Sequence, residues 1–305
     1  MEKVDAYQPM SSDDKTASIL RAFHTYLPEN GRVNFLNHLD SLQINQQLHD
    51  HARSLIDGLV TPFISLRSTP SISPRLGMED SIASVASEST GPIQIQDHLK
   101  VECLARDGNR CVVSGLFEEA SVDRNSTEPI TLTECVHIIP FSLASWHSRS
   151  ENHAKDVIWT NLIRHFPTLE TIRFTRENIN DTANAMTMSF SLHRHFGRFD
   201  FSFEETSQLQ KYRIQNHSPR MQMRLPRTVF FNWYDRRYDL PHPELLKVHA
   251  IIAQIFHASG AAEQIQKALY YLEGHCALAK DGSTDVSSIL AATTLGVLAS
   301  RGDNA

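Results

Sequence analysis

The chain has 305 residues, of which 41% are hydrophobic, and its 29 basic and 35 acidic side chains give a formal net charge of −6. This length and composition allow one sizeable hydrophobic core or two modest ones, and the net charge does not by itself indicate a nucleic-acid-binding protein. The four cysteines form no Cys-x-x-Cys pair, which argues against a zinc ribbon or a disulfide scaffold and fits a reducing compartment.

The first residues show no pattern of a signal peptide or a basic transit segment. Residues 2–15 are polar, and the longest apolar stretch near the other end, residues 289–299, is too short to cross a bilayer. We therefore expect an intracellular protein, nuclear or cytoplasmic, that does not enter a membrane.

Residues 1–66 form a predicted N-terminal helical segment. Apolar residues at helical spacing predict two helices, the second from about residue 44 to residue 60 and ended by Pro62. His49 and His51 are two residues apart and do not share a helix face, so we expect both at the surface. The segment suits packing or the binding of a protein partner.

Residues 67–95 form a predicted Ser/Pro-rich linker. Seven serines and two prolines fall between residues 67 and 91, and the apolar residues there follow no clear period. Low hydrophobicity with many serines favours a flexible segment, which marks a domain boundary.

Residues 96–240 hold the short strands and turns of a predicted compact domain. A strand or helix at residues 93–105 leads into the turn Arg106-Asp107-Gly108. The predicted elements that follow are a β-branched strand at 111–113, an apolar strand at 136–139 stopped by Pro140, and residues 185–191 leading into a helical turn at 192–196.

The order of short motifs within residues 96–203 resembles the HNH nucleases, and most closely the branch common in fungal proteins. The motifs are Arg106-Asp107-Gly108 with Cys111, Ser114 and Gly115, then Val136-His137-Ile138-Ile139-Pro140, then Asn184 with Met188, and finally Leu192-His193 with Phe196. The spacing from Asn184 to His193 is that of the family. The resemblance implies a ββα-metal finger, with one histidine on a strand, one on the helix and an asparagine between them.

The resemblance also assigns roles to three residues. His137 would be the general base that takes a proton from the attacking water, and an imidazole with a pKa of roughly 6.5 suits that task at neutral pH. His193 would hold the metal ion, and Asn184 would fix the loop and orient the base. Asn180 and His195 are the rivals for Asn184 and His193. The spacing of Asn180 fits less well, and His195 points to another side of a helix.

From the residues alone, other interpretations stay open. His137 also fits a core histidine bonded to the backbone, because its neighbours are apolar, and Asn184 also fits a plain turn asparagine. Many HNH nucleases have an aspartate or histidine as second metal ligand just before the strand histidine. Here Val136 stands there, and Glu134 and Cys135 are nearby but not at that position.

The expected cofactor is a divalent metal ion. The Cys-x-x-Cys pair of metal-stabilised relatives is replaced by Cys111 and Ser114, so we expect no structural zinc and a core position for Cys111. A site with one protein ligand can still bind Mg²⁺ through water and substrate phosphate, with Mn²⁺ or Zn²⁺ as alternatives.

One stretch of the chain, residues 206–237, is strongly basic. It holds seven lysines and arginines against Asp235, with five aromatic residues among them. Such a stretch can guide a nucleic-acid backbone, and we expect DNA. The alternative is that its aromatics belong to the core and its arginines are solvated, since residues 96–240 carry no net charge.

Residues 241–305 form a predicted C-terminal helical segment, with helices over about 245–258 and 261–272. The whole chain predicts an α+β protein in which an HNH finger is embedded between mainly helical segments. We expect metal-dependent, endonuclease-like hydrolysis of nucleic-acid phosphodiester bonds. The alternatives are a non-nucleolytic HNH scaffold, acting as a binding module or on a small molecule, and a helical partner-binding protein with a relic finger.

Overall fold

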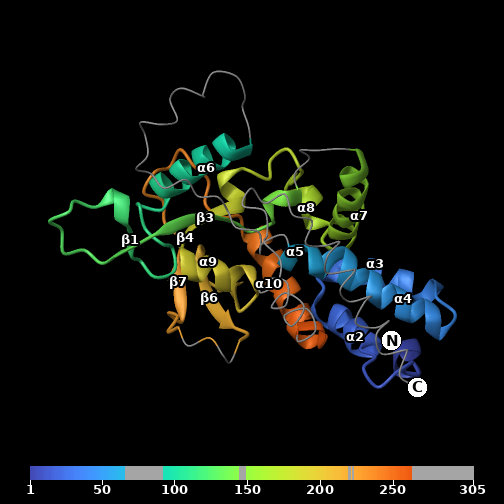
Figure 1. The fold of residues 1–305 in the computed structure, drawn as a ribbon. Coiled ribbons are helices and arrows are strands. Elements are labelled where there is room, and N and C mark those ends of the chain that lie inside the picture. The colour runs from blue at the N-terminus through green and yellow to red at the C-terminus, as the bar shows by residue number, and fades with distance from the viewer. Residues whose placement is uncertain (66–91, 144–148, 219–220, 222, 263–305) are drawn as a thin grey trace, which may run out of the picture. The chain divides into compact units, whose positions relative to one another are not determined.

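A computed structural model describes residues 1–65, 92–143, 149–218, 221 and 223–262 (Figure 1). The chain divides into two compact units, each assembled from stretches that are separated in the sequence. The first unit comprises Met1–Thr69, Ser142–Arg176 and Val248–Ala305, and the second comprises Pro70–Phe141 and Glu177–Lys247. Most of the predicted linker at 67–95 and of the predicted helix at 261–272 lies outside the described residues.

The first unit is helical where it is described. Its elements are α1 (Glu2–Asp5), α2 (Thr16–Tyr26), α3 (Glu29–Ser41), α4 (Asn45–Leu55), a π turn (Ile56–Val60), α5 (Thr61–Ser65), α7 (Arg149–His165), α8 (Thr168–Thr171) and the larger part of α10 (Pro243–Ala258). The predicted stop at Pro62 is wrong. Pro62 lies in the first turn of α5, where its missing N–H is tolerated, so the helical path continues past it.

Close packing in the first unit depends on Gly31 of α3. A Cβ atom at this position would lie 1.9 Å from the main-chain oxygen of His165 in α7. On the same helix α3, the ring of Phe35 stacks on the ring of Phe23 from α2, with centroids 6.2 Å apart. Only a residue without a side chain allows α3 to come this close to α7.

The surface position predicted for His51 is wrong. Its ring stacks on Phe35 with centroids 5.9 Å apart, and its Nε2 atom is shielded from solvent. His51 lies three residues after Leu48 and four before Leu55, so it shares the buried face of α4 with them. Burial, with smaller contributions from His38, His165 and Arg164, lowers the pKa of His51 to about 4.

The second unit mixes helices with three small sheets. Its elements are α6 (Pro92–Arg106), β1 (Phe117–Glu118), a 3-10 turn (Glu119–Ser121), β2 (Ile130–Thr131), β3 (Thr133–His137), a 3-10 turn (Thr182–Asn184), β4 (Ala185–Ser189), α9 (Phe190–Gly197), β5 (Phe201–Glu205), β6 (Lys211–Asn216) and β7 (Thr228–Phe230). A further 3-10 turn, Phe141–Leu143, begins in the second unit at Phe141 and continues into residues of the first unit. β1 and β2 pair in parallel, β3 and β4 antiparallel, and β5, β6 and β7 form an antiparallel sheet in that order.

The strand predicted at 111–113 is wrong. These residues enter a turn in which the N–H of Gly115 donates to the carbonyl of Cys111 (2.9 Å), and Gly115 has φ +72°. The turn overrides the β propensity of Val112 and Val113. Cys111 itself is fully buried, as expected.

The predicted α+β class agrees with this mixture of helices and small sheets. An aromatic cluster forms part of the core of the second unit, and it joins α9 to the three-stranded sheet through Phe196, Phe201, Phe203, Tyr212 and Phe231. None of the described helices is long and apolar enough to cross a membrane. The metal-bound ββα finger stays a prediction.

Candidate active site

The predicted site residues lie on the antiparallel pair of strands β3 and β4, on the turn before β4 and on α9, which follows β4 and contacts both strands. Alternate residues of a strand point to opposite faces, so Glu134 and Val136 share one face of β3 while Cys135 and His137 share the other. Glu134 contacts His193 of α9, and Cys135 contacts Cys103 of α6. The β3–β4 strand pair therefore lies between α6 and α9.

His137 ends β3, opposite Ala185 of β4. Its Nε2 atom lies 3.0 Å from Oδ1 of Asn180, and its ring centroid is 5.5 Å from that of Phe141. Because an amide oxygen can only accept a hydrogen bond, this contact places a proton on Nε2. In the neutral ring, Nδ1 is then the basic nitrogen.

Asn184 is completely buried in the turn before β4. Its Nδ2 donates to the carbonyls of Ile139 (3.0 Å) and Ile179 (2.8 Å), and its Oδ1 accepts from the N–H of Ile139 (2.9 Å). Its main-chain oxygen accepts from the N–H of Ile138 (2.8 Å). Asn184 thus fastens the loop after His137, and the Asn180 side chain forms a hydrogen bond with the His137 ring.

His193 lies near the middle of α9, and its Nδ1 is 2.5 Å from Oε2 of Glu134. Both side chains are shielded, with 17% of His193 and 13% of Glu134 exposed. Glu134 is three residues before His137 and therefore does not occupy the expected second-ligand position directly before this histidine. The signal that could have found it is strand alternation, which puts Glu134 on the same face as Val136.

His195 makes a separate contact with a carboxylate. Its Nδ1 lies 2.7 Å from Oδ2 of Asp200, just beyond the end of α9. At about 100° per residue, His195 is rotated by roughly 200° from His193 around the helix. The structure therefore gives the two histidines different carboxylate partners, one on β3 and one close by in the sequence.

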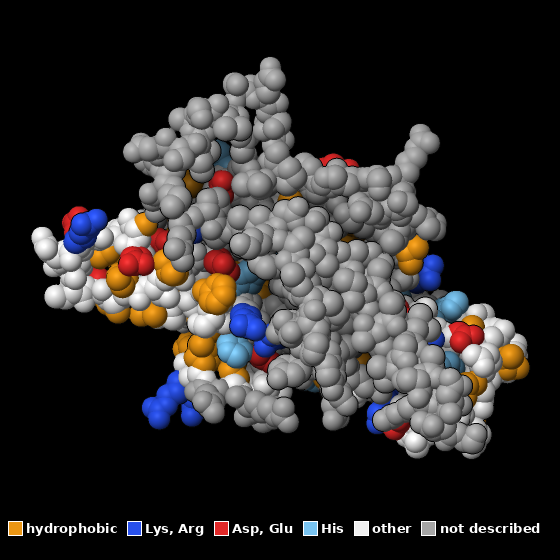
Figure 2. All heavy atoms as spheres, in the orientation of Figure 1, with side chains coloured by type: hydrophobic (Ala, Val, Ile, Leu, Met, Phe, Trp, Pro, Cys, Tyr) orange, Lys and Arg blue, Asp and Glu red, His pale blue; other side chains and the backbone are white. Residues whose placement is uncertain are grey.

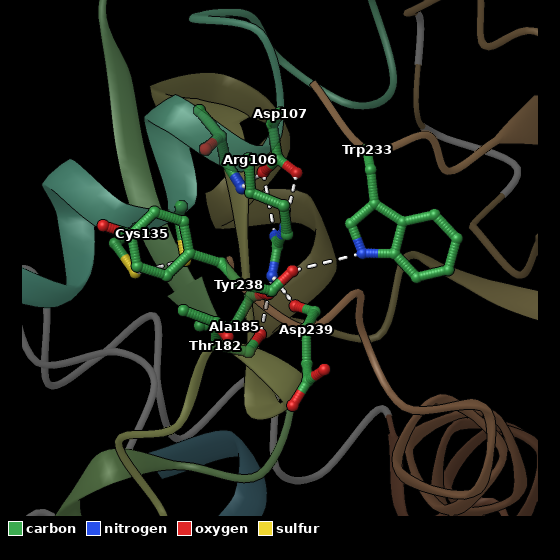
Figure 3. Close-up of polar contacts among 10 residues, drawn as sticks. Arg106, Asp107, Cys135, Thr182, Ala185, Trp233, Tyr238 and Asp239 are labelled. Atoms are coloured by element: carbon green, nitrogen blue, oxygen red, sulfur yellow. Dashed lines mark hydrogen bonds and ion pairs between the residues drawn. The ribbon is translucent and has the colours of Figure 1, made fainter. Parts of the chain in front are cut away.

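A buried ion pair, Arg106 with Asp107, anchors the region around Asn184 (Figure 3). The Arg106 guanidinium makes two bonds to the Asp107 carboxylate (2.7 and 2.9 Å) and donates to the carbonyls of Thr182 (2.7 Å), Asp239 (2.8 Å) and Ala185 (3.0 Å). Asp107 also accepts from the N–H of Thr187 (2.9 Å). Burial, the largest single effect, would lower the pKa of Arg106, but the charge and hydrogen bonds of Asp107, together with Cys103 and Cys135, raise this pKa overall.

The donor set for a metal ion is small. Among the described residues, no three or more His, Cys, Asp or Glu side chains are grouped so that they could hold an ion. The hydrogen bond to Cys103 and burial raise the pKa of the Cys135 thiol well above its ordinary range. His193, with Glu134 as its hydrogen-bond partner, suits a hydrated Mg²⁺ or Mn²⁺ that takes further ligands from water and phosphate, and the pair does not suit a structural zinc site.

The basic stretch at 206–237 divides into a packed and an exposed part. In the packed part, Tyr212 and Phe231 are buried with ring centroids 5.0 Å apart. Arg213, next to Tyr212, is exposed and pairs with Glu204 (2.6 Å). The aromatics of the exposed part are Phe230, Trp233 and Tyr234. Figure 2 shows basic side chains standing out beside β7 on the face that is drawn.

Residues 111–204 match a family model described as HNH endonuclease. The predicted HNH resemblance is confirmed for this segment. The match includes His137, Asn184 and His193, and also Glu134 and Asn180. No curated protein and no solved structure matches the chain, and the fungal branch stays a prediction.

Proposed function

We propose that the chain is a metal-dependent endonuclease that hydrolyses phosphodiester bonds of nucleic acids at its HNH segment. The main support for this proposal is the hydrogen bonding around His137, which lies within the matched segment. Asn180 bonds its Nε2, so that Nδ1 is the basic nitrogen, and Asn184 fastens the loop that follows it.

In the proposed reaction, Nδ1 of His137 takes a proton from a water molecule as the water oxygen attacks phosphorus. The bond between phosphorus and the 3′ oxygen breaks, and that oxygen leaves with a proton from solvent. The products are a 5′ phosphate and a 3′ hydroxyl. Asn184 positions the base indirectly, by holding Ile138 and Ile139 immediately after it.

The proposed metal ligand is His193. A bound divalent ion, with Mg²⁺ preferred to Mn²⁺ or Zn²⁺, supplies charge that polarises the phosphate and stabilises the departing oxygen. Glu134, the partner of His193, precedes His137 by three residues on β3, which is roughly 10 Å along a strand. By strand alternation, the side chains of Glu134 and His137 leave β3 on opposite faces.

For substrate binding we propose the exposed part of the basic stretch. Phe230, Trp233 and Tyr234 present exposed rings, and the Arg236 guanidinium lies 6.0 Å from the Trp233 ring centroid. Aromatic rings next to arginines suit bases and phosphates of an unpaired strand. We expect DNA, with the locally opened strand of a supercoiled plasmid as a suitable substrate.

Cleavage of a panel of substrates tests this function. Purified full-length protein is incubated with supercoiled plasmid, single-stranded DNA and RNA, each with Mg²⁺, with Mn²⁺ or with EDTA. We expect plasmid nicking and single-strand cleavage that both stop in EDTA. Folded protein that cleaves no substrate with either ion would contradict the proposal.

The absence of a three-donor group among the described residues favours a second candidate, a DNA-binding module on an HNH scaffold. This candidate predicts binding without cleavage. The logarithm of its affinity for DNA would fall linearly with the logarithm of salt concentration, because phosphate contacts release counterions. Trp233→Ala would weaken the binding.

A further inference from the structure

The contact between Glu134 and His193 determines which nitrogen of the His193 ring carries a proton. An ionised carboxylate can only accept a hydrogen bond, and Oε2 of Glu134 lies 2.5 Å from Nδ1 of His193. Nδ1 must therefore be the protonated nitrogen. In the neutral ring, the lone pair is then on Nε2, on the side of the ring away from Glu134.

The two residues reach this contact from distant parts of the chain. Glu134 is on the face of β3 that α9 covers, and His193 is 59 residues later in the sequence. The neighbouring pair, His195 and Asp200, is only five residues apart and closes the end of its own helix, where the Asp200 N–H also donates to the His195 carbonyl (3.0 Å). The contact from Glu134 on β3 to His193 on α9 therefore fixes the direction of the His193 ring relative to the β3–β4 strand pair.

We propose that Glu134 is a positioning residue that holds His193 in its Nδ1–H form and so presents Nε2 as the ligand for a divalent ion. The inference rests on the proposed function for the role of the ion. Metal-bound histidines commonly donate their second ring N–H to a carboxylate, which fixes the ring and strengthens the ligand. Glu134 thereby supports the ion through His193, whereas Val136, at the usual second-ligand position, offers no donor atom.

The state of the His193 ring is measured directly in the full-length protein without metal. Histidine labelled with ¹⁵N is observed by long-range proton–nitrogen correlation at pH 8, above the ordinary imidazole pKa of roughly 6.5. The His193 signals are assigned by their loss in His193→Ala. We expect the Nδ1–H form in the wild type and a mixture of both neutral forms in Glu134→Gln, because an amide both donates and accepts.

The second readout is binding of Mn²⁺ alone, followed by the electron paramagnetic resonance of the free ion. Glu134→Gln is expected to weaken Mn²⁺ binding about 10- to 100-fold. The matched control is Asp200→Asn, which changes the partner of His195 in the same way and should leave Mn²⁺ binding and the His193 signals unchanged.

The outcomes separate this inference from the proposed function. A wild-type His193 in the Nε2–H form, or with both nitrogens protonated, would overturn the role of Glu134. So would Mn²⁺ binding that is equal in wild type and Glu134→Gln. A wild type that binds Mn²⁺ and shows the Nδ1–H form, yet cleaves no nucleic acid, would support the role of Glu134 and contradict the endonuclease function.

Discussion

Nε2 of His137 lies 3.0 Å from Oδ1 of Asn180, so the ring of the proposed base is held by a residue that spacing alone ranked below Asn184. Replacing Asn180 by alanine removes this acceptor and the hydrogen bond that helps to orient the ring. We expect kcat for DNA cleavage to fall about 10- to 100-fold, because small misplacements of a catalytic group are costly. The matched control is Asn30→Ala, which removes an exposed asparagine of α3. Full activity in Asn180→Ala would contradict the orienting role.

We expect that any replacement of the side-chain amide of Asn184 lowers the stability of the folded protein. Asn184→Asp keeps an acceptor for the Ile139 N–H but places a second oxygen against the carbonyls of Ile139 and Ile179. We expect a loss of roughly 2–4 kcal/mol in the free energy of unfolding, because buried donors are lost and an oxygen is left unpaired. Urea unfolding measures this loss, and a midpoint equal to that of the wild type would show that the three bonds are not made.

The Arg106–Asp107 pair is expected to be a major stabilising contact of the second unit. Arg106→Met leaves the Asp107 carboxylate buried without its charge partner and leaves three carbonyls without a donor. The expected destabilisation is about 3–5 kcal/mol, measured by urea unfolding. Arg236→Met is the control, because Arg236 is exposed, and it should cost less than about 0.5 kcal/mol. Equal losses in the two variants would refute the assignment.

The stability of the first unit should depend on pH through His51, which is partly buried, and His165, which is buried. Burial lowers the pKa of both His51 and His165 to about 4, whereas an unfolded histidine titrates near 6.5. Between these values the unfolded chain binds more protons than the folded one, so the free energy of unfolding decreases as the pH falls from about 6.5 to about 4. Each histidine contributes at most about 3 kcal/mol.

His51→Phe tests this dependence, since phenylalanine suits the stacked position against Phe35 and cannot take up a proton. Denaturant unfolding at a series of pH values should give a shallower slope between pH 6.5 and pH 4 for the variant than for the wild type. An identical slope in both proteins would show that His51 is protonated equally in the folded and unfolded chains.

The HNH segment could be identified from the sequence because its motifs are residue identities in a fixed order, which need no knowledge of packing. The strands were harder to predict. Val112 and Val113 favour a strand locally, yet Gly115 closes a turn there, and β3 pairs with β4 across about fifty residues. Local propensity contains no information on such long-range pairing. His51 was assigned to the surface because its position was compared with that of His49 and not with Leu48 and Leu55.

Three candidate site residues could also be predicted from the sequence, but their side-chain contacts could not. His137, Asn184 and His193 follow from the motif, but Glu134 and Asn180 take part through side-chain bonds over 59 and 43 residues. The sequence identified Arg106 as part of a motif but did not predict its role in stability. Its three carbonyl partners come from stretches that are separated in the sequence and meet in the folded unit. Contacts of this kind depend on how strands and helices pack, which one sequence does not specify residue by residue.

The most direct test of the central proposal is nicking of supercoiled plasmid by the wild type, His137→Ala, His193→Ala and His195→Ala, each with Mg²⁺, with Mn²⁺ and with EDTA. We predict metal-dependent nicking by the wild type and by His195→Ala, and a loss of at least about 100-fold in the other two variants. Nicking that survives in His137→Ala, or that persists in EDTA, would contradict the assignment of His137 as the base of a metal-dependent nuclease.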